Sequence, residues 1–154
     1  LSTASFLEAC ETIPQLKRLA NLHIGILLFQ AQQNVACHAL HRVEGRLCRW
    51  ILQAHDVTES NILQLTQEFL SNMLGAQRTS VSMIAHNLQQ AGIIRYRRGR
   101  IEIVDRLGLE AASCDCYSRI KREVDARLPP GSRASLSGLL PGSSATRPSN
   151  AISS

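Results

Sequence analysis

Two short amphipathic helical patterns meet at Gly75, and this junction constrains the fold more than any other feature of the chain. Before it, Thr66 is placed to cap a helix, because its hydroxyl can accept a hydrogen bond from a free first-turn amide. Gly75 suits the left-handed conformation in which helices commonly end. Beyond it, apolar residues recur at the i, i+3, i+4, i+7 spacing of a buried stripe: Val81, Ile84, Ala85 and Leu88. The pattern predicts a helix-turn-helix.

The second predicted helix runs from about Gln77 to Gln90 and has an outer face of mostly short, polar side chains led by an arginine. That face consists of Arg78, Thr79, Ser82, Met83 and His86. Helical hairpins packed inside a core show the same apolar spacing. A functional interpretation therefore needs a second feature beside this helix.

The segment 93–104 supplies that feature, because it alternates apolar and polar residues on both sides of Arg98 and Gly99. This alternation predicts a small β-hairpin, or wing. Four arginines lie on or beside its tip: Arg95, Arg97, Arg98 and Arg100. An arginine-rich turn alone is usually a solvated loop. Beside a helix-turn-helix, however, it places positive charge where a DNA duplex presents its phosphates. The conjunction predicts a winged helix that binds DNA.

These residues resemble the bacterial transcription regulators related to the cyclic-AMP receptor protein and Fnr. The resemblance covers about residues 6–120 and is most specific in segments 65–68, 73–75, 78–81, 88–89, 92–94, 98–99 and 105–106. Residues 109–117 are similar to the segment that often ends one branch of this family. Residues 14–16 and 41–52 are similar to that branch's dimerisation helix and to the helix that follows it.

Arg78 is the best candidate to read a base, because a guanidinium can donate two parallel hydrogen bonds to guanine in the major groove. The resemblance implies that Thr79, Ser82 and Met83 also face bases, and that Ser80 and the wing arginines contact phosphates. Many relatives have arginine at the position of Met83, so their half-site should not be assumed here. The full set of expected DNA-binding residues is Thr66, Gln77, Arg78, Thr79, Ser80, Ser82, Met83, Arg97, Arg98 and Arg100.

The expected architecture is mainly α: a winged helix-turn-helix with a long N-terminal dimerisation helix and a small β-hairpin wing. Residues 1–13 are interpreted as the remnant of an effector domain, 14–37 as the dimerisation helix, 38–127 as the DNA-binding domain and 128–154 as a disordered tail. The family normally carries a cyclic-nucleotide-binding β-roll before the long helix. The chain is therefore expected to be a truncated regulator, or a fragment of one, without its sensor.

Three helical patterns flank the predicted DNA-reading motif. The long one has a stripe for a second subunit: Leu16, Leu19, His23, Ile26, Leu27 and Gln30. The next, about residues 39–55, has core positions Leu40, Val43, Leu47, Trp50, Ile51 and Ala54. The last begins after a capping Asp105 and continues to about Arg127.

Composition agrees with this interpretation. The formal net charge of +5 suits a polyanionic partner without proving one. No apolar run is long enough to span a bilayer, and the N-terminal residues do not resemble a signal peptide, so a cytoplasmic protein with no membrane partner is expected. Glycine-rich phosphate loops, nucleophile elbows and zinc-protease motifs are absent from the sequence, which argues against an enzyme.

The five cysteines are expected to be reduced thiols rather than a metal site. Their spacings contain no Cys-x-x-Cys, and Cys114 with Cys116 offers two soft ligands where structural zinc usually needs four. The five histidines are scattered and are expected to form no ligand set with the thiols. No cofactor is predicted.

The sequence thus predicts a Crp/Fnr-type regulator that binds a palindromic operator in double-stranded DNA as a homodimer, with RNA polymerase as a further candidate partner. The alternative is a protein-interaction module that pairs with full-length relatives and blocks their DNA binding. Affinity of the isolated chain for a palindromic duplex distinguishes the two.

Overall fold

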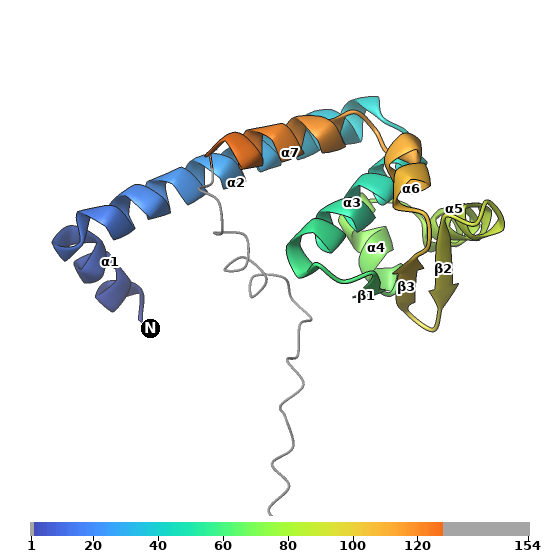
Figure 1. The fold of residues 1–154 in the computed structure, drawn as a ribbon, viewed down its shortest axis with the longest axis horizontal. Coiled ribbons are helices and arrows are strands. Elements are labelled where there is room, and N and C mark those ends of the chain that lie inside the picture. Colours follow the sequence, from blue (N-terminus) through green and yellow to red (C-terminus); the bar gives the residue numbers. More distant parts are fainter. Residues whose placement is uncertain (1, 128–154) are drawn as a thin grey trace, which may run out of the picture.

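The computed structural model describes residues 2–127, which form seven helices and one small sheet (Figure 1). The predicted disorder of 128–154 lies outside these residues. Helix α1 (Thr3–Thr12) begins at Ser2, whose hydroxyl accepts a hydrogen bond from the Ser5 amide. Helix α2 (Pro14–Leu40) has Pro14 in its first turn, where a missing N–H costs nothing. It continues past the predicted end at Cys37.

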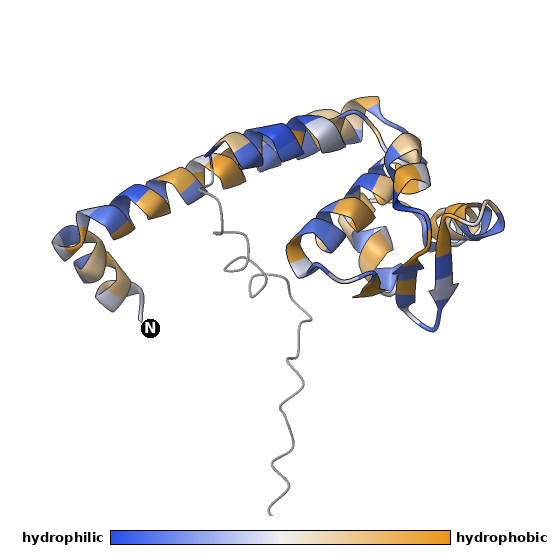
Figure 2. Cartoon of the chain, in the orientation of Figure 1, coloured by the Kyte–Doolittle hydropathy of each residue, from blue (hydrophilic) through white to orange (hydrophobic). Residues whose placement is uncertain are grey.

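Helix α2 extends away from the rest of the molecule, and α7 (Cys116–Arg127) lies along its C-terminal half (Figure 1). Ile26 and Cys37 are the buried residues of α2. Ile26 is therefore covered by its own chain and is not free to meet a partner as predicted. Figure 2 shows apolar segments recurring along the same helix. Six of its large apolar side chains stay exposed: Leu19, Ile24, Leu27, Leu28, Val35 and Leu40. The prediction that Leu40 belongs to the core is wrong.

Helix α3 (Val43–Thr58) runs through the core and begins later than the predicted start at residue 39. Leu47, Ile51 and Ala54 are buried, as predicted, while Trp50 and Val43 pack against the core from its edge. Arg46 is also buried, and its guanidinium donates to the His38 and Leu74 carbonyl oxygens at 3.2 and 2.6 Å. Because these carbonyls lie at the C-terminal ends of two helices, the arginine also faces the negative ends of their dipoles.

The predicted helix-turn-helix is present as α4 (Gln67–Leu74) and α5 (Arg78–Gln90). The Thr66 hydroxyl accepts a hydrogen bond from the Phe69 amide at 3.1 Å, and Gly75 ends α4 with a left-handed φ of 56°. The predicted stripe of α5 is buried throughout. The Thr66 cap and the Gly75 turn are local features, and the apolar stripe of α5 is a periodic one. All three can therefore be predicted from the sequence without tertiary information.

The sheet has three antiparallel strands in the order β1-β3-β2, built from β1 (Ile62–Gln64), β2 (Ile94–Arg97) and β3 (Arg100–Ile103). Strands β2 and β3 are the predicted wing. Arg98 and Gly99 form its two-residue turn with φ of 46° and 77°, the positive pair that suits the twist of a hairpin. Strand β1 was not predicted, because three residues carry too little periodicity.

The helix predicted from Asp105 to about Arg127 is broken into α6 (Arg106–Ala112) and α7. The Asp105 carboxylate does cap α6, accepting from the Gly108 amide at 3.0 Å. Ser113 then leaves the helix in an extended conformation, and the Cys114 amide donates to the Gly45 carbonyl on α3 at 3.2 Å. A tertiary hydrogen bond therefore replaces a helical one at the break.

Buried polar contacts join α3, α6 and α7 behind the reading motif. Arg106 and the Tyr117 hydroxyl bind the two carboxylate oxygens of Asp56, each at 2.8 Å, and Arg106 also lies 2.7 Å from the Tyr117 oxygen. Burial and the Asp56 carboxylate both raise the pKa of Tyr117 above its ordinary value. The network fixes α7 against the core at the end where it turns along α2.

Candidate nucleic-acid interface

The N-terminal end of α5 presents the outer face predicted from the sequence. Arg78, Thr79 and Met83 are exposed, while Ser80 and Ser82 are half-buried. Met83 is a large apolar side chain with 61% of its surface exposed. The Ser82 hydroxyl donates to the Arg78 carbonyl at 2.9 Å, so it offers its lone pairs outward more readily than its proton. Exposed apolar and polar groups thus alternate on one face of a rigid helix.

Gln77 precedes this helix as its N-cap and makes no side-chain capping hydrogen bond. The first amides of an α-helix have no hydrogen-bond partner within the helix, and their N–H groups lie at the positive, N-terminal end of the helix dipole. An uncapped N-terminus of this kind is suited to an anion such as a phosphate. Ser80 lies in the same first turn, where its hydroxyl can add a further donor.

The wing is anchored to both helices of the motif. The Tyr96 amide donates to the Gln89 side chain of α5 at 2.8 Å. A Cβ at Gly99 would lie only 3.3 Å from the Thr66 methyl group, so the hairpin tip closely approaches the start of α4. Burial raises the pKa of Tyr96, while the Gln67 backbone and the Arg78 charge act in the opposite direction. Arg78 therefore lies near the wing as well as at the head of α5.

The wing arginines are not equivalent. Arg95 is paired with Glu102, its cross-strand neighbour, at 2.8 Å. Within residues 2–127, Arg97, Arg98 and Arg100 form no ion pair with a carboxylate. Arg97 and Arg100 lie directly opposite each other in the register, and like charges so placed repel. An anion bound between them would relieve that repulsion, whereas the charge of Arg95 is already paired with Glu102.

A protein-family model for the Crp-like helix-turn-helix domain matches residues 45–112. Residues 45–112 form a Crp-like helix-turn-helix domain. This match includes α3 from its third residue onward, the helix-turn-helix, the complete sheet and α6. It confirms the resemblance predicted from the sequence.

Solved structures share the fold of the Crp-like domain and the helices around it. A transcriptional regulator of the Crp/Fnr family from Eubacterium rectale has a TM-score of 0.54 at 19% identity, over 70% of this chain and 50% of that one. A transcriptional regulator of the CRP family from Thermus thermophilus has a TM-score of 0.52 at 17% identity, over 73% of this chain and 55% of that one. The chain thus spans about half the length of these regulators. No curated protein sequence matches the chain.

The Crp-like domain contains every predicted DNA-binding position, from Thr66, which lies beside the wing tip, to Arg100 on β3. Among residues 2–127, no helix combines the length and the apolar character needed to cross a membrane. Sequence reasoning missed one cluster outside the domain's reading face. Cys37, His41, Cys114 and Cys116 place one ligand atom each within 4.8 Å of the others. The expectation that the histidines are scattered away from the thiols is wrong for His41, whose Nδ1 lies 3.4 Å from the Cys116 sulfur.

Proposed function

We propose that this chain binds duplex DNA in a sequence-specific manner as a homodimer and thereby regulates transcription. The observation that carries the proposal is the exposed, arginine-led face of α5 beside a wing whose Arg97, Arg98 and Arg100 have no carboxylate partner among residues 2–127. An α-helix of this kind fits the major groove, where each base pair presents a distinct pattern of donors and acceptors. The adjoining wing then meets the sugar-phosphate backbone.

In this account Arg78, Thr79, Ser82 and Met83 face base edges. Arg78 makes the bidentate contact to guanine, and Met83 offers an apolar contact that suits a thymine methyl group. Phosphates are bound by Ser80, by the free first-turn amides of α5 that follow Gln77, and by the three wing arginines. Thr66 contributes by position, because it both caps α4 and supports the hairpin tip at Gly99.

The dimer would form through α2. Four apolar side chains of this helix remain at least half exposed in the single chain: Ile24, Leu27, Leu28 and Val35. A second copy of α2 offers the same apolar surface in return, which is the condition for a two-fold interface. Two reading helices related by a two-fold axis require a palindromic operator. Such a regulator works in the bacterial cytoplasm, where RNA polymerase is its further proposed partner.

Replacing Arg78 with alanine is expected to cost about 1–3 kcal/mol on the preferred site and to remove discrimination at one base pair, while leaving non-specific affinity nearly intact. The reason is that Arg78 heads the exposed face of α5. Competition binding with duplexes changed at each position measures the effect. An equal loss of affinity on every duplex would show that Arg78 contacts a phosphate and that the base-reading assignment is wrong.

Replacing Arg97 or Arg98 with alanine is expected to weaken binding to all sequences alike. Each lost phosphate contact should reduce the slope of log affinity against log salt by about one unit. Arg95→Ala is the matched control, because Arg95 lies on the same hairpin but is already paired with Glu102. Binding titrations at several salt concentrations measure the slopes. Equal slope changes in Arg95→Ala and Arg97→Ala would mean that the unpaired arginines have no special role.

A further inference from the structure

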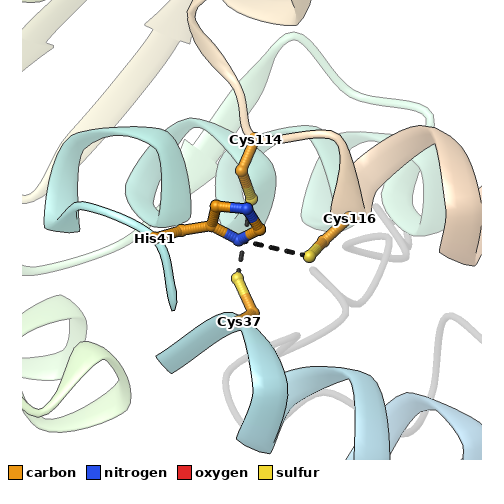
Figure 3. Close-up of side chains that lie close together, drawn as sticks. All are labelled: Cys37, His41, Cys114 and Cys116. Carbon is orange, nitrogen blue, oxygen red and sulfur yellow. Dashed lines mark hydrogen bonds between the residues drawn. The ribbon is translucent and has the colours of Figure 1, made fainter. Parts of the chain in front are cut away.

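Three sulfur atoms and one imidazole converge where α2 ends and α7 begins (Figure 3). Cys37 belongs to the last turn of α2 and His41 is its C-cap, while Cys114 precedes α7 and Cys116 opens it. The Cys37 and Cys114 sulfurs are 3.5 Å apart, and the Cys116 sulfur is 3.4 Å from His41 Nδ1. Cys37 and Cys116 are buried, and the other two ligands are partly covered.

We propose that Cys37, His41, Cys114 and Cys116 form a structural zinc site that joins the end of α2 to the start of α7. Three thiolates and one imidazole are a common ligand set for tetrahedral Zn²⁺. Bond lengths of about 2.3 Å to sulfur and about 2.0 Å to nitrogen imply tetrahedral S···S edges of about 3.8 Å and S···N edges of about 3.5 Å. The Cys37–Cys114 sulfur separation of 3.5 Å and the Cys116–His41 separation of 3.4 Å are slightly shorter than these edges. All four ligand atoms lie within 4.8 Å of one another, so small side-chain shifts would close them around one ion. Four protein ligands leave no open position, so the site is structural rather than catalytic.

The surroundings of the cluster orient two ligands. His41 Nε2 lies 3.1 Å from an Asp115 carboxylate oxygen, which holds Nδ1 toward the sulfur atoms. This carboxylate–histidine arrangement is the usual second-shell support of a zinc-bound imidazole. Gln33 Nε2 donates to the Cys116 sulfur at 3.1 Å. Both contacts are consistent with a thiolate and a neutral imidazole directed at one central ion.

Charge also favours a metal at this position. One Zn²⁺ with three thiolates and a neutral imidazole carries a net charge of −1, and binding releases the three thiol protons to solvent. Arg49 is completely buried; its Nη1 donates to the Gln53 side chain at 2.6 Å, but within residues 2–127 its Nε and Nη2 have no hydrogen-bond partner. Burial raises the pKa of the Cys37 and Cys114 thiols, and the positive charge of Arg49 acts in the opposite direction on both. A buried cation with two unsatisfied nitrogens is costly, and a metal–thiolate centre would supply the opposite charge.

The two halves of the site come from distant parts of the chain, since Cys37 and Cys114 are 77 residues apart. The loop before α7 is held against α3 by the hydrogen bond from the Cys114 amide to the Gly45 carbonyl, and a Cβ at Gly45 would lie 3.2 Å from that nitrogen. Zinc would therefore fix α2 relative to the Crp-like domain. This consequence rests on the proposed function: the zinc-mediated link between α2 and the domain, here called the clip, would set the spacing of the two reading helices in the dimer.

The test is metal analysis of the full chain, purified under reducing conditions with zinc supplied and then dialysed. We expect about one zinc per chain, and tetrahedral thiolate absorption when cobalt(II) replaces it. Cys114→Ser and His41→Asn should each lose stoichiometric zinc, whereas Cys10→Ser, which changes a thiol outside the cluster, should retain it. Asp115→Asn should weaken zinc affinity about 10–100-fold with the ligands intact.

Substoichiometric zinc in the unmodified chain would overturn the proposal, as would equal zinc loss in Cys10→Ser and Cys114→Ser. A Cys37–Cys114 disulfide in the reduced preparation would also overturn it. Cobalt titration of the unmodified chain decides the matter if the serine variant fails to fold. Operator binding is measured separately on the same samples. Zinc without DNA binding would contradict the proposed function alone, and DNA binding unchanged by zinc removal would contradict the clip.

Discussion

A Leu27→Asp chain is expected to sediment as a monomer at micromolar concentrations at which the unmodified chain is a dimer. Leu27 is half exposed in the single chain and lies on the proposed interface of α2. An aspartate there would leave an unpaired charge in each half of a two-fold contact, at a cost on the order of several kcal/mol. Analytical ultracentrifugation measures the state directly.

Arg18→Asp is the matched control for this variant. Arg18 is exposed and lies nine positions before Leu27, which places it on the opposite side of the same helix. It should therefore remain dimeric despite a larger change in charge. An unmodified chain that is already monomeric would contradict the homodimer and, with it, tight binding to a palindrome. A chain that pairs only with a longer relative would instead support the protein-interaction alternative.

The second large effect is expected from Leu74→Ala, which should destabilise the fold by about 2–5 kcal/mol. Leu74 is completely buried at the end of α4, immediately before the Gly75 turn. Its truncation leaves a cavity between the two helices of the reading motif, and the total stability of such a domain is only about 5–15 kcal/mol. Urea unfolding followed by circular dichroism measures the change.

Met83→Ala separates stability from recognition in the same motif. Met83 is exposed, so its truncation should change the free energy of unfolding by less than about 0.5 kcal/mol. It should nevertheless alter base preference at one position of the site. If Met83→Ala destabilises the fold as much as Leu74→Ala, the outer face of α5 contributes to packing and the proposed reading surface is wrong.

The reading motif was predictable because its signals are local. Thr66 and Gly75 act within one helical turn of their own positions, and the alternation around Arg98 marks a hairpin without reference to the rest of the chain. The same reasoning failed where distant residues decide the structure. The helix after Asp105 breaks because Cys114 bonds to Gly45 on α3, and β1 exists only through its pairing with β3.

The cysteine cluster shows the same limit. The sequence contains a Cys-x-x-x-His pair at Cys37 and His41 and a Cys-x-Cys pair at Cys114 and Cys116, and either pair alone is too common to indicate a metal. Their meeting depends on α7 turning back along α2, which no local pattern specifies. The signal that could have indicated this cluster is the presence of both short pairs in one chain, because together they supply the four ligands that a zinc ion needs.

Sequence-specific recognition by α5 can be measured by selecting bound duplexes from a random pool with the unmodified chain, and with Arg78→Ala in parallel, at two salt concentrations. We expect enrichment of an inverted repeat whose half-sites lie about one helical turn apart, and one position of each half-site should lose its preference in Arg78→Ala. Recovery of unrelated duplexes by the unmodified chain at both salt concentrations would contradict sequence-specific recognition by α5.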